Sequence, residues 1–384
     1  MDPVVRLLED LVAIDSVNPS LVAGGAGEGE IAGFISAWLR QAGFNVQMRD
    51  VAPGRPNVIA VAEGRGDGPT RLLCGHTDTV GVEGMTAPFA PVVRDGRLYG
   101  RGAQDMKAGV AAMLDAARTW LREGRRGAGK VIVAAVADEE YASLGADALA
   151  REWRADEAVI PEPTDLQIGI AHKGFSCAEI VVHGRAAHGS RPVDGRDAIF
   201  LMGRLLPRLE ALGHALQASA RHPLLGAPSL HAGTIAGGTS LSVYPAECVL
   251  KVERRTLPDE PVTTAVDEVN AIVAQLAAQD PEFVCDVRLI LARSGYELDP
   301  GADVLRHLES AIASRLGVRP RAGLSYWTDA AILGAAGTPT AIFGPRGHGL
   351  HSVEEAVVVD DVIGCRDVLA SWLTGVGRTE QGRA

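Results

Sequence analysis

Leu72-Leu73-Cys74-Gly75-His76-Thr77-Asp78 is the stretch from which the fold of this 384-residue chain can be read most directly. A short apolar run of this kind is typical of a parallel strand buried on both faces, and the glycine indicates where it ends. His76 and Asp78 then leave the end of that strand, two positions apart. In open α/β sheets, ligands bind beyond the carboxyl ends of the strands, so both side chains are candidates for a binding site.

Apolar segments that end in acidic or histidine side chains recur along the chain. The later examples are Lys130–Ala137 before Asp138-Glu139-Glu140, Ala158–Ile160 before Pro161-Glu162-Pro163, and Pro339–Phe343 before a loop with His348 and His351. Segments with helical periodicity lie between these strands. The alternation predicts an α/β fold with a mainly parallel, helix-covered sheet.

The pattern changes near Lys173. Up to about Leu291 it predicts a strand, a helix, two strands, a helix and a strand, the order of a ferredoxin-like unit. The predicted first helix, Ala198–Leu216, contains Pro207, which favours a kink or break, and the third predicted strand is Leu241–Glu253. We therefore predict a discontinuous large domain, residues 1–173 and 289–384, with residues 174–288 inserted as a small domain. The polar tail after Thr374 is expected to fray.

Charge and cysteine content limit the partners and the compartment. The chain has 37 basic and 48 acidic residues and a net charge of −11, which argues against nucleic acid or an anionic membrane as a partner. Its five cysteines are dispersed, which indicates reduced thiols and a cytoplasmic location. The amphipathic N-terminus does not have the pattern of a signal peptide, and no apolar run reaches the length of about 18 residues that spans a bilayer.

Five side chains at segment ends form a candidate metal site: His76, Asp105, Glu140, Glu162 and His351. Zinc accepts imidazole and carboxylate ligands, and a catalytic zinc keeps one position open for water. Two histidines and three carboxylates suit two ions about 3.5–4 Å apart, with Asp105 as the bridge. Cobalt or manganese could occupy the same ligands.

Two further acids have predicted roles beside these ligands. Asp78 is placed to accept the second ring N–H of His76 and so to fix its tautomer. Glu139, next to Glu140, is left as a general base for the water held by the metal ions. Each pattern alone also has an ordinary explanation, because acids favour helix starts and His–Asp pairs are common polar contacts.

Six motifs occur in order across nearly the whole chain: GHTDTV, GRGAQDMKAG, ADEEYASLG, PEPT, GRAAHGSRP and FGPRGHGLHSVEE. Together they resemble the dizinc amidohydrolase and metallopeptidase family of acetylornithine deacetylase, succinyl-diaminopimelate desuccinylase, aminoacylase and glutamate carboxypeptidase. The resemblance implies amide hydrolysis by a hydroxide that bridges two zinc ions, with Glu139 as the base. It also implies that the large domain is catalytic and that the inserted domain is a lid and a dimerisation domain.

The resemblance assigns two residues of the inserted domain. His188, in AAHGSRP, matches a histidine that reaches the site of the other subunit in a homodimer and stabilises the oxyanion. Arg255, in ERRTLP, matches an arginine that binds the substrate carboxylate, and the neighbouring Arg254 is the alternative.

The resemblance bears on the ligand loops as well. His351 is preferred to His348 as a ligand because it precedes Ser352-Val353-Glu354-Glu355, as in relatives. The Asp105-Met106 bond is expected to be the family's cis peptide.

The substrate is left open by the sequence. Ser242, in GGTSLSVYP, stands where relatives often carry asparagine, so neither the acyl group nor the amino acid is identified. We expect a deacylase of N-acyl amino acids similar to acetylornithine deacetylase. A dipeptidase or carboxypeptidase acting on short peptides is the alternative within the family, and a non-catalytic metal- or peptide-binding protein is the alternative from another class.

Overall fold

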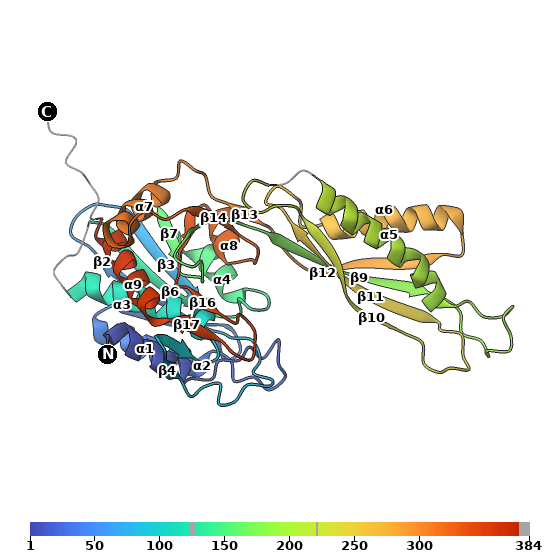
Figure 1. Cartoon of the computed structure of the whole chain (residues 1–384), viewed down its shortest axis with the longest axis horizontal. Coiled ribbons are helices and arrows are strands. Elements are labelled where there is room, and N and C mark those ends of the chain that lie inside the picture. Colours follow the sequence, from blue (N-terminus) through green and yellow to red (C-terminus); the bar gives the residue numbers. More distant parts are fainter. Residues whose placement is uncertain (123–127, 220–221, 376–384) are drawn as a thin grey trace. The chain divides into compact units, whose positions relative to one another are not determined.

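The structure, a computed structural model, describes residues 1–122, 128–219 and 222–375 (Figure 1). Its contacts divide the chain into two compact units, one of Met1–Ile170, Leu298–Ala322 and Thr328–Ala384, the other of Ala171–Glu297 and Gly323–Trp327. The predicted insertion, 174–288, lies within the second unit, and its boundaries stay a prediction. Most of the tail that was expected to fray, 376–384, lies outside the described residues.

Most strands of a nine-stranded sheet belong to the first unit; the order is β1-β2-β6-β3-β7-β15-β8-β13, with β14 paired to β8. The bounds are β1 Asn45–Ala52, β2 Arg55–Glu63, β3 Thr70–His76, β6 Lys130–Val136, β7 Glu157–Ile160, β8 Ile168–His172, β13 Tyr296–Glu297, β14 Arg321–Leu324 and β15 Thr340–Ile342. The central neighbours β6, β3, β7 and β15 are parallel. Pairing on both sides of this centre is antiparallel. The prediction of a mainly parallel sheet is confirmed for its centre.

Burial explains why the central strands are continuous apolar runs. Every residue of β3 after Thr70 is buried, and so is every residue of β6 after Lys130. The two strands pair in register from Thr70 with Lys130 to His76 with Val136. They therefore end side by side, and the polar residues that follow each strand meet at the same edge.

Helices cover the sheet on both faces. Their bounds are α1 Pro3–Val12, α2 Gly29–Ala42, α3 Ala108–Arg122, α4 Leu144–Glu152, α7 Asp303–Leu316, α8 Ala330–Ala335 and α9 Val359–Thr374. Helix α3 packs against α1, α2 and α9 as well as against β3 and β6, while α4 packs against α8. Close packing of α3 depends on Gly109, where a Cβ atom would lie 2.0 Å from the carbonyl oxygen of Pro161.

A small antiparallel sheet, ordered β16-β17-β5-β4, adjoins this core. It consists of β4 (Val92–Arg94), β5 (Arg97–Tyr99), β16 (Gly347–His348) and β17 (Ala356–Val358). The hairpin that Asp95-Gly96 predicts joins β4 to β5. Pairing of β17 with β5 fixes one end of the loop that carries His351.

The second unit has the predicted ferredoxin-like order. Its elements are β9 (Gly174–His183), α5 (Ala198–Ala218), β10 (Ser229–Gly237), β11 (Glu247–Thr256), α6 (Thr264–Gln279) and β12 (Val284–Arg293). The four strands form an antiparallel sheet in the order β10-β11-β9-β12, and α5 and α6 cover one of its faces (Figure 1).

Helix α5 continues through Pro207, so of the predicted kink or break the break is wrong. One strand boundary also differs from the prediction. Strand β11 begins at Glu247 and not at Leu241, because Pro245 has no N–H to donate to a neighbouring strand. Within the part of the chain that the structure describes, no helix has the length and hydropathy needed to cross a bilayer.

Candidate metal and catalytic site

All five candidate ligands lie together beyond the central strands. His76 ends β3, Glu140 follows β6 and Glu162 follows β7, whereas Asp105 lies in the irregular turn η1 (Ala103–Lys107) and His351 in the loop between β16 and β17. Their ligand atoms fall into two groups, His76 with Asp105 and Glu162, and Asp105 with Glu140 and His351. Within each group the atoms lie within 4.8 Å of one another. Asp105 is the shared member, the position that the sequence predicts for a bridge.

The distances show how Asp105 serves both groups. Its Oδ1 lies 3.1 Å from Nε2 of His76, and its Oδ2 lies 3.2 Å from Nε2 of His351. Glu162 Oε1 is 3.5 Å from Nε2 of His76, and Glu140 Oε2 is 3.1 Å from Nε2 of His351. Each histidine therefore directs one ring nitrogen at a different oxygen of the same carboxylate.

The residues present fit a pair of divalent cations. Two imidazoles and three carboxylates are a donor set that zinc and similar ions accept. Oε1 of Glu140 is buried and receives no hydrogen bond from any described residue. Several acidic side chains with little exposure, close to one another, also need positive charge, because an uncompensated buried carboxylate is costly.

The pKa values of the cluster reflect its need for positive charge. Burial, and then the charge of Asp105, raise the pKa of Glu140 to about 7. Burial raises the pKa of Glu162 well above its usual value. Hydrogen bonds with Asp105 and Glu140 raise the pKa of His351 to about 10. Protons thus neutralise the cluster when no cation does, and a bound metal ion would displace them.

Glu139 lies beside the cluster but belongs to neither group of three. Its Oε2 is 3.9 Å from Nε2 of His76, and its side chain is 11% exposed. Burial, and then the charge of Glu162, raise its pKa well above the ordinary value, although the charge of His76 opposes them. A carboxylate in this position is available for proton transfer.

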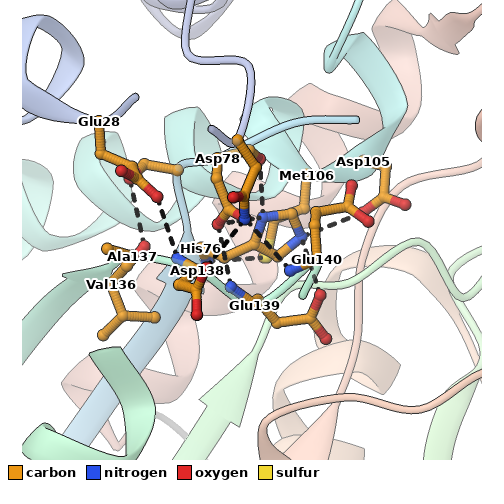
Figure 2. A network of polar contacts seen from close by, with 12 residues as sticks. Glu28, His76, Asp78, Asp105, Met106, Val136, Ala137, Asp138, Glu139 and Glu140 are labelled. Atoms are coloured by element: carbon orange, nitrogen blue, oxygen red, sulfur yellow. Dashed lines mark hydrogen bonds and ion pairs between the residues drawn. The ribbon is translucent and has the colours of Figure 1, made fainter. Parts of the chain in front are cut away.

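Asp78 makes contacts that differ in part from the prediction. Nδ1 of His76 lies 3.0 Å from the main-chain carbonyl oxygen of Asp78 and 3.6 Å from its carboxylate, so the carbonyl is the nearer acceptor. The carboxylate instead accepts the main-chain N–H groups of Glu139 and Glu140, each at 3.1 Å (Figure 2). Asp78 therefore fixes the two glutamates as well as the histidine.

Glu355 is a positioning residue that the sequence reasoning missed. Its buried carboxylate accepts the main-chain N–H groups of Gly102, Gln104 and Asp105 at 2.8–3.0 Å, and the Arg101 guanidinium at 2.6 Å. These bonds hold the turn that contains Asp105 and the expected Asp105-Met106 cis peptide, which the structure confirms. The only signal was its place in the motif around His351.

His348 lies outside the cluster. Its Nδ1 is 3.1 Å from Nη1 of Arg97, and its ring packs edge-on against Tyr99. Of the two histidines in this loop, His351 is the one brought to Asp105.

The other predicted residues belong to the second unit. His188 is exposed, with Nδ1 2.8 Å from Oγ of Ser190, and Ser242 is exposed in a loop. Arg254 is buried and bound by Glu260 and Glu268. Arg255 is 34% exposed and pairs with Glu253. Arg254 is thus held by ion pairs within the unit, and Arg255 is the more exposed of the two arginines.

An α/β sheet whose strand ends gather histidines and carboxylates, in a chain that also carries a ferredoxin-like unit, is the architecture of metal-dependent hydrolases of amide and peptide bonds. This chain belongs to the peptidase family M20/M25/M40, whose family model matches residues 72–375. The protein is accordingly a hydrolase that acts on amide or peptide bonds.

Individual relatives cover almost the whole chain. It is 31% identical over 376 residues to an acetylornithine deacetylase of Myxococcus xanthus, a match that covers 94% of each chain. A tripeptidase of Staphylococcus aureus has the same fold at 20% identity, with a TM-score of 0.82 over 98% of each chain. A dinuclear metal-binding peptidase of the M20 family from Bacillus subtilis is similar at 18% identity, with a TM-score of 0.73 over 98% of each chain.

Proposed function

We propose that the protein is a metal-dependent deacylase that hydrolyses the amide bond of N-acyl amino acids. The observation that carries the proposal is the cluster centred on Asp105, with Glu139 beside it. Similarity to the acetylornithine deacetylase of Myxococcus xanthus supports an acylated amino acid as the substrate class.

In this proposal His76 and Glu162 would hold one zinc ion, Glu140 and His351 would hold a second, and Asp105 would serve both. The dinuclear metal binding of the Bacillus subtilis relative supports two ions, and cobalt or manganese would suit the same donors. When bound, the ions supply Lewis acidity toward the substrate carbonyl and lower the pKa of the attacking water.

The side chains of the protein then carry out the proton transfers. Glu139 removes a proton from water as the water oxygen bonds to the carbonyl carbon, and it delivers that proton to the amine nitrogen as the C–N bond breaks. The products are a carboxylic acid, which keeps the second water proton until it ionises in solution, and a free amine. Burial, which favours the protonated form of Glu139, helps it to hold the proton between the two steps.

We assign roles in the reaction to two residues that the second unit carries, His188 and Arg255. His188, supplied by the partner subunit of a homodimer, stabilises the oxyanion of the tetrahedral intermediate. Arg255 binds the carboxylate of the substrate, for which a guanidinium offers two parallel hydrogen bonds.

The surface of the second unit supports the homodimer. Strand β10 is an edge strand and is exposed from His231 to Gly237. Exposed edges and apolar patches are typical of interfaces, and Phe200 is 77% exposed, Ile235 53% and Leu241 fully. We also propose a cytoplasmic location. The five cysteines are free thiols, and thiols stay reduced in the cytoplasm.

The second candidate function is that of a peptidase, favoured by the fold shared with the Staphylococcus aureus tripeptidase. A panel of N-acetyl and N-succinyl amino acids, dipeptides and tripeptides, assayed with the zinc-loaded protein, separates the two. We expect the highest kcat/KM on an N-acyl amino acid. If only peptides are cleaved, the protein is a peptidase and the deacylase proposal is wrong. If the protein binds metal but cleaves none of these substrates, the non-catalytic alternative is favoured.

Glu139→Ala tests the proposed base. We expect kcat to fall at least about 10²-fold, because proton transfer by a positioned acid or base contributes 10²–10⁴-fold. Metal content, measured by elemental analysis after dialysis, should stay that of the wild type. Loss of metal in this variant would mean that Glu139 is a ligand and not the base.

A further inference from the structure

A buried polar network lies behind the turn that carries Glu139 and Glu140. It joins Asn18 and Glu28, from the segment between α1 and α2, to Arg55 of β2 and to the two acids Asp78 and Asp138. All five residues are buried, Arg55 being the most exposed at 6%. None of Asn18, Glu28, Arg55 and Asp138 touches a reacting group in the proposed mechanism, so the network needs another explanation.

Asn18 links the two acids of the network. Its Nδ2 donates to Oδ2 of Asp78 at 2.7 Å and to Oδ1 of Asp138 at 3.1 Å. Its Oδ1 accepts the N–H of Ser20 at 2.8 Å, which fixes the orientation of the amide. Asn18 also donates its main-chain N–H to the carbonyl oxygen of Thr79 at 2.8 Å. An amide NH₂ has the two hydrogens that bridging two carboxylates requires, whereas a third carboxylate has none.

Arg55 joins Asp138 to Glu28. Its Nη1 lies 2.7 Å from Oδ1 of Asp138, and its Nε and Nη2 bind the two oxygens of Glu28. Oε1 of Glu28 accepts the main-chain N–H of Asp138 at 3.1 Å (Figure 2). Burial alone would lower the pKa of Arg55, but the bonds and charges of Glu28 and Asp138 raise it. One cation thus holds both the side chain and, through Glu28, the main chain of Asp138.

The turn that these contacts hold needs outside support. Asp138 has a φ of 72°, in the left-handed region that few residues other than glycine adopt. The next two N–H groups, of Glu139 and Glu140, donate to the carboxylate that Asn18 binds. The Asp78 carboxylate that holds these two N–H groups is thus bound by Asn18, and the Asp138 carboxylate is bound by both Asn18 and Arg55.

We propose that Asn18 and Arg55 are positioning residues that set the directions of Glu139 and Glu140. Through Asp78 and Asp138 they keep the base and the metal ligand, which are adjacent in the chain, pointing into one pocket. This inference rests on the proposed function, because it gives Glu139 and Glu140 their roles. It goes further by making the N-terminal segment, residues 16–28, part of the catalytic apparatus.

Two variants and one matched control test the proposal. Asn18→Asp keeps the shape of the side chain and the bond from Ser20 but removes the two donors. Arg55→Met removes the cation. Arg71→Met, the control, removes an arginine that is equally buried and pairs with Glu157 at 3.3 Å, at the opposite end of β3 from His76.

Metal affinity is measured by chelator competition, kcat and KM on the best substrate, and stability by thermal unfolding. We expect Asn18→Asp and Arg55→Met each to lower kcat about 10–100-fold, with KM within about threefold, and to weaken binding of one of the two zinc ions by about 10–100-fold. Arg71→Met should lower the melting temperature and leave kcat and both metal affinities unchanged.

The outcomes separate this inference from the proposed function. If both variants behave like Arg71→Met, losing stability alone, the inference is overturned. If the wild type binds no metal, the proposed function fails, and this inference fails with it. If Arg55→Met does not fold, Asn18→Asp decides the question, because it changes no side-chain volume of consequence.

Discussion

At the scale of single residues, protons and metal cations would compete for the same side chains of the site. In the metal-free protein, the pKa of Glu140 is raised from 4.5 to about 7 and that of His351 from 6.5 to about 10. Asp105 is shifted the other way, because hydrogen bonds from His351 and His76 outweigh its burial and lower its pKa. The two histidines therefore compensate one carboxylate, and Glu140 and Glu162 bind protons more tightly than ordinary glutamates do.

These shifts predict the pH dependence of stability. Glu140 and His351 bind protons more tightly in the folded protein than in the unfolded chain, so the free energy of unfolding falls as pH rises. The stability that Glu140 contributes is lost between about pH 4.5 and 7, and that of His351 between about pH 6.5 and 10. Asp105 has the opposite sign, but its titration lies below its ordinary pKa of 3.8.

Burial lowers the pKa of Lys107 to about 7, which makes the free energy of unfolding rise with pH above that value. We therefore expect the melting temperature of metal-free protein to fall between about pH 5 and 7, measured by calorimetry in matched buffers. Zinc should raise it, and by more at higher pH, because ligands must lose their protons to bind metal. A metal-free melting temperature that rises over this range would show that the protons are not held as described.

At the scale of elements, the turn η1 depends on a residue about 250 positions away. Glu355→Gln keeps the shape of the side chain but removes the charge that three N–H groups and Arg101 share. We expect kcat to fall about 10–100-fold with weaker metal binding, because the turn carries Asp105. Glu354→Gln, at the exposed neighbouring position, is the control and should behave as the wild type in both assays.

The packing of α3 on the end of β7 gives a stability prediction. Gly109→Ala would place a Cβ atom 2.0 Å from the carbonyl oxygen of Pro161. We expect the free energy of unfolding to fall by about 1–3 kcal/mol, measured by urea denaturation, because the backbone must move. Gly203→Ala in α5 meets nothing within 4 Å and should instead raise it by about 0.5–1 kcal/mol. Equal effects at both positions would exclude the clash as the cause.

At this scale the sequence predicts a residue's role when the pattern that reveals it lies in neighbouring residues, and not when the role depends on partners far away in the chain. His76, Glu140 and Glu162 were found because each follows a buried apolar strand that periodicity locates. Strand β1 was missed because it is largely exposed and has no alternating apolar face. Glu355 and Asn18 were missed because their partners are main-chain N–H groups or acids in distant segments, and no spacing in the chain encodes those contacts.

At the scale of the whole molecule, the proposed homodimer makes a prediction about shared sites. If His188 serves the partner subunit, neither His188→Ala nor Glu139→Ala homodimers should be active. Mixed dimers would contain one intact site, with Glu139 from one chain and His188 from the other. Unfolding and refolding an equal mixture should therefore restore about a quarter of wild-type activity, since statistical exchange leaves one site in four intact.

The control is each variant refolded alone, which should stay inactive. An inactive mixture that nevertheless contains mixed dimers, as shown by native mass spectrometry of differently tagged chains, would mean that His188 acts within its own subunit. An active His188→Ala homodimer would mean that His188 has no part in the reaction.

The central claim is that residues from 76 to 351 hold two cations around Asp105. Anomalous X-ray scattering at the zinc absorption edge, from crystals of the zinc-loaded protein, tests it most directly. We predict two peaks per chain, about 3.5–4 Å apart, one on each side of the Asp105 carboxylate. A single peak, or peaks away from Asp105, would contradict the account.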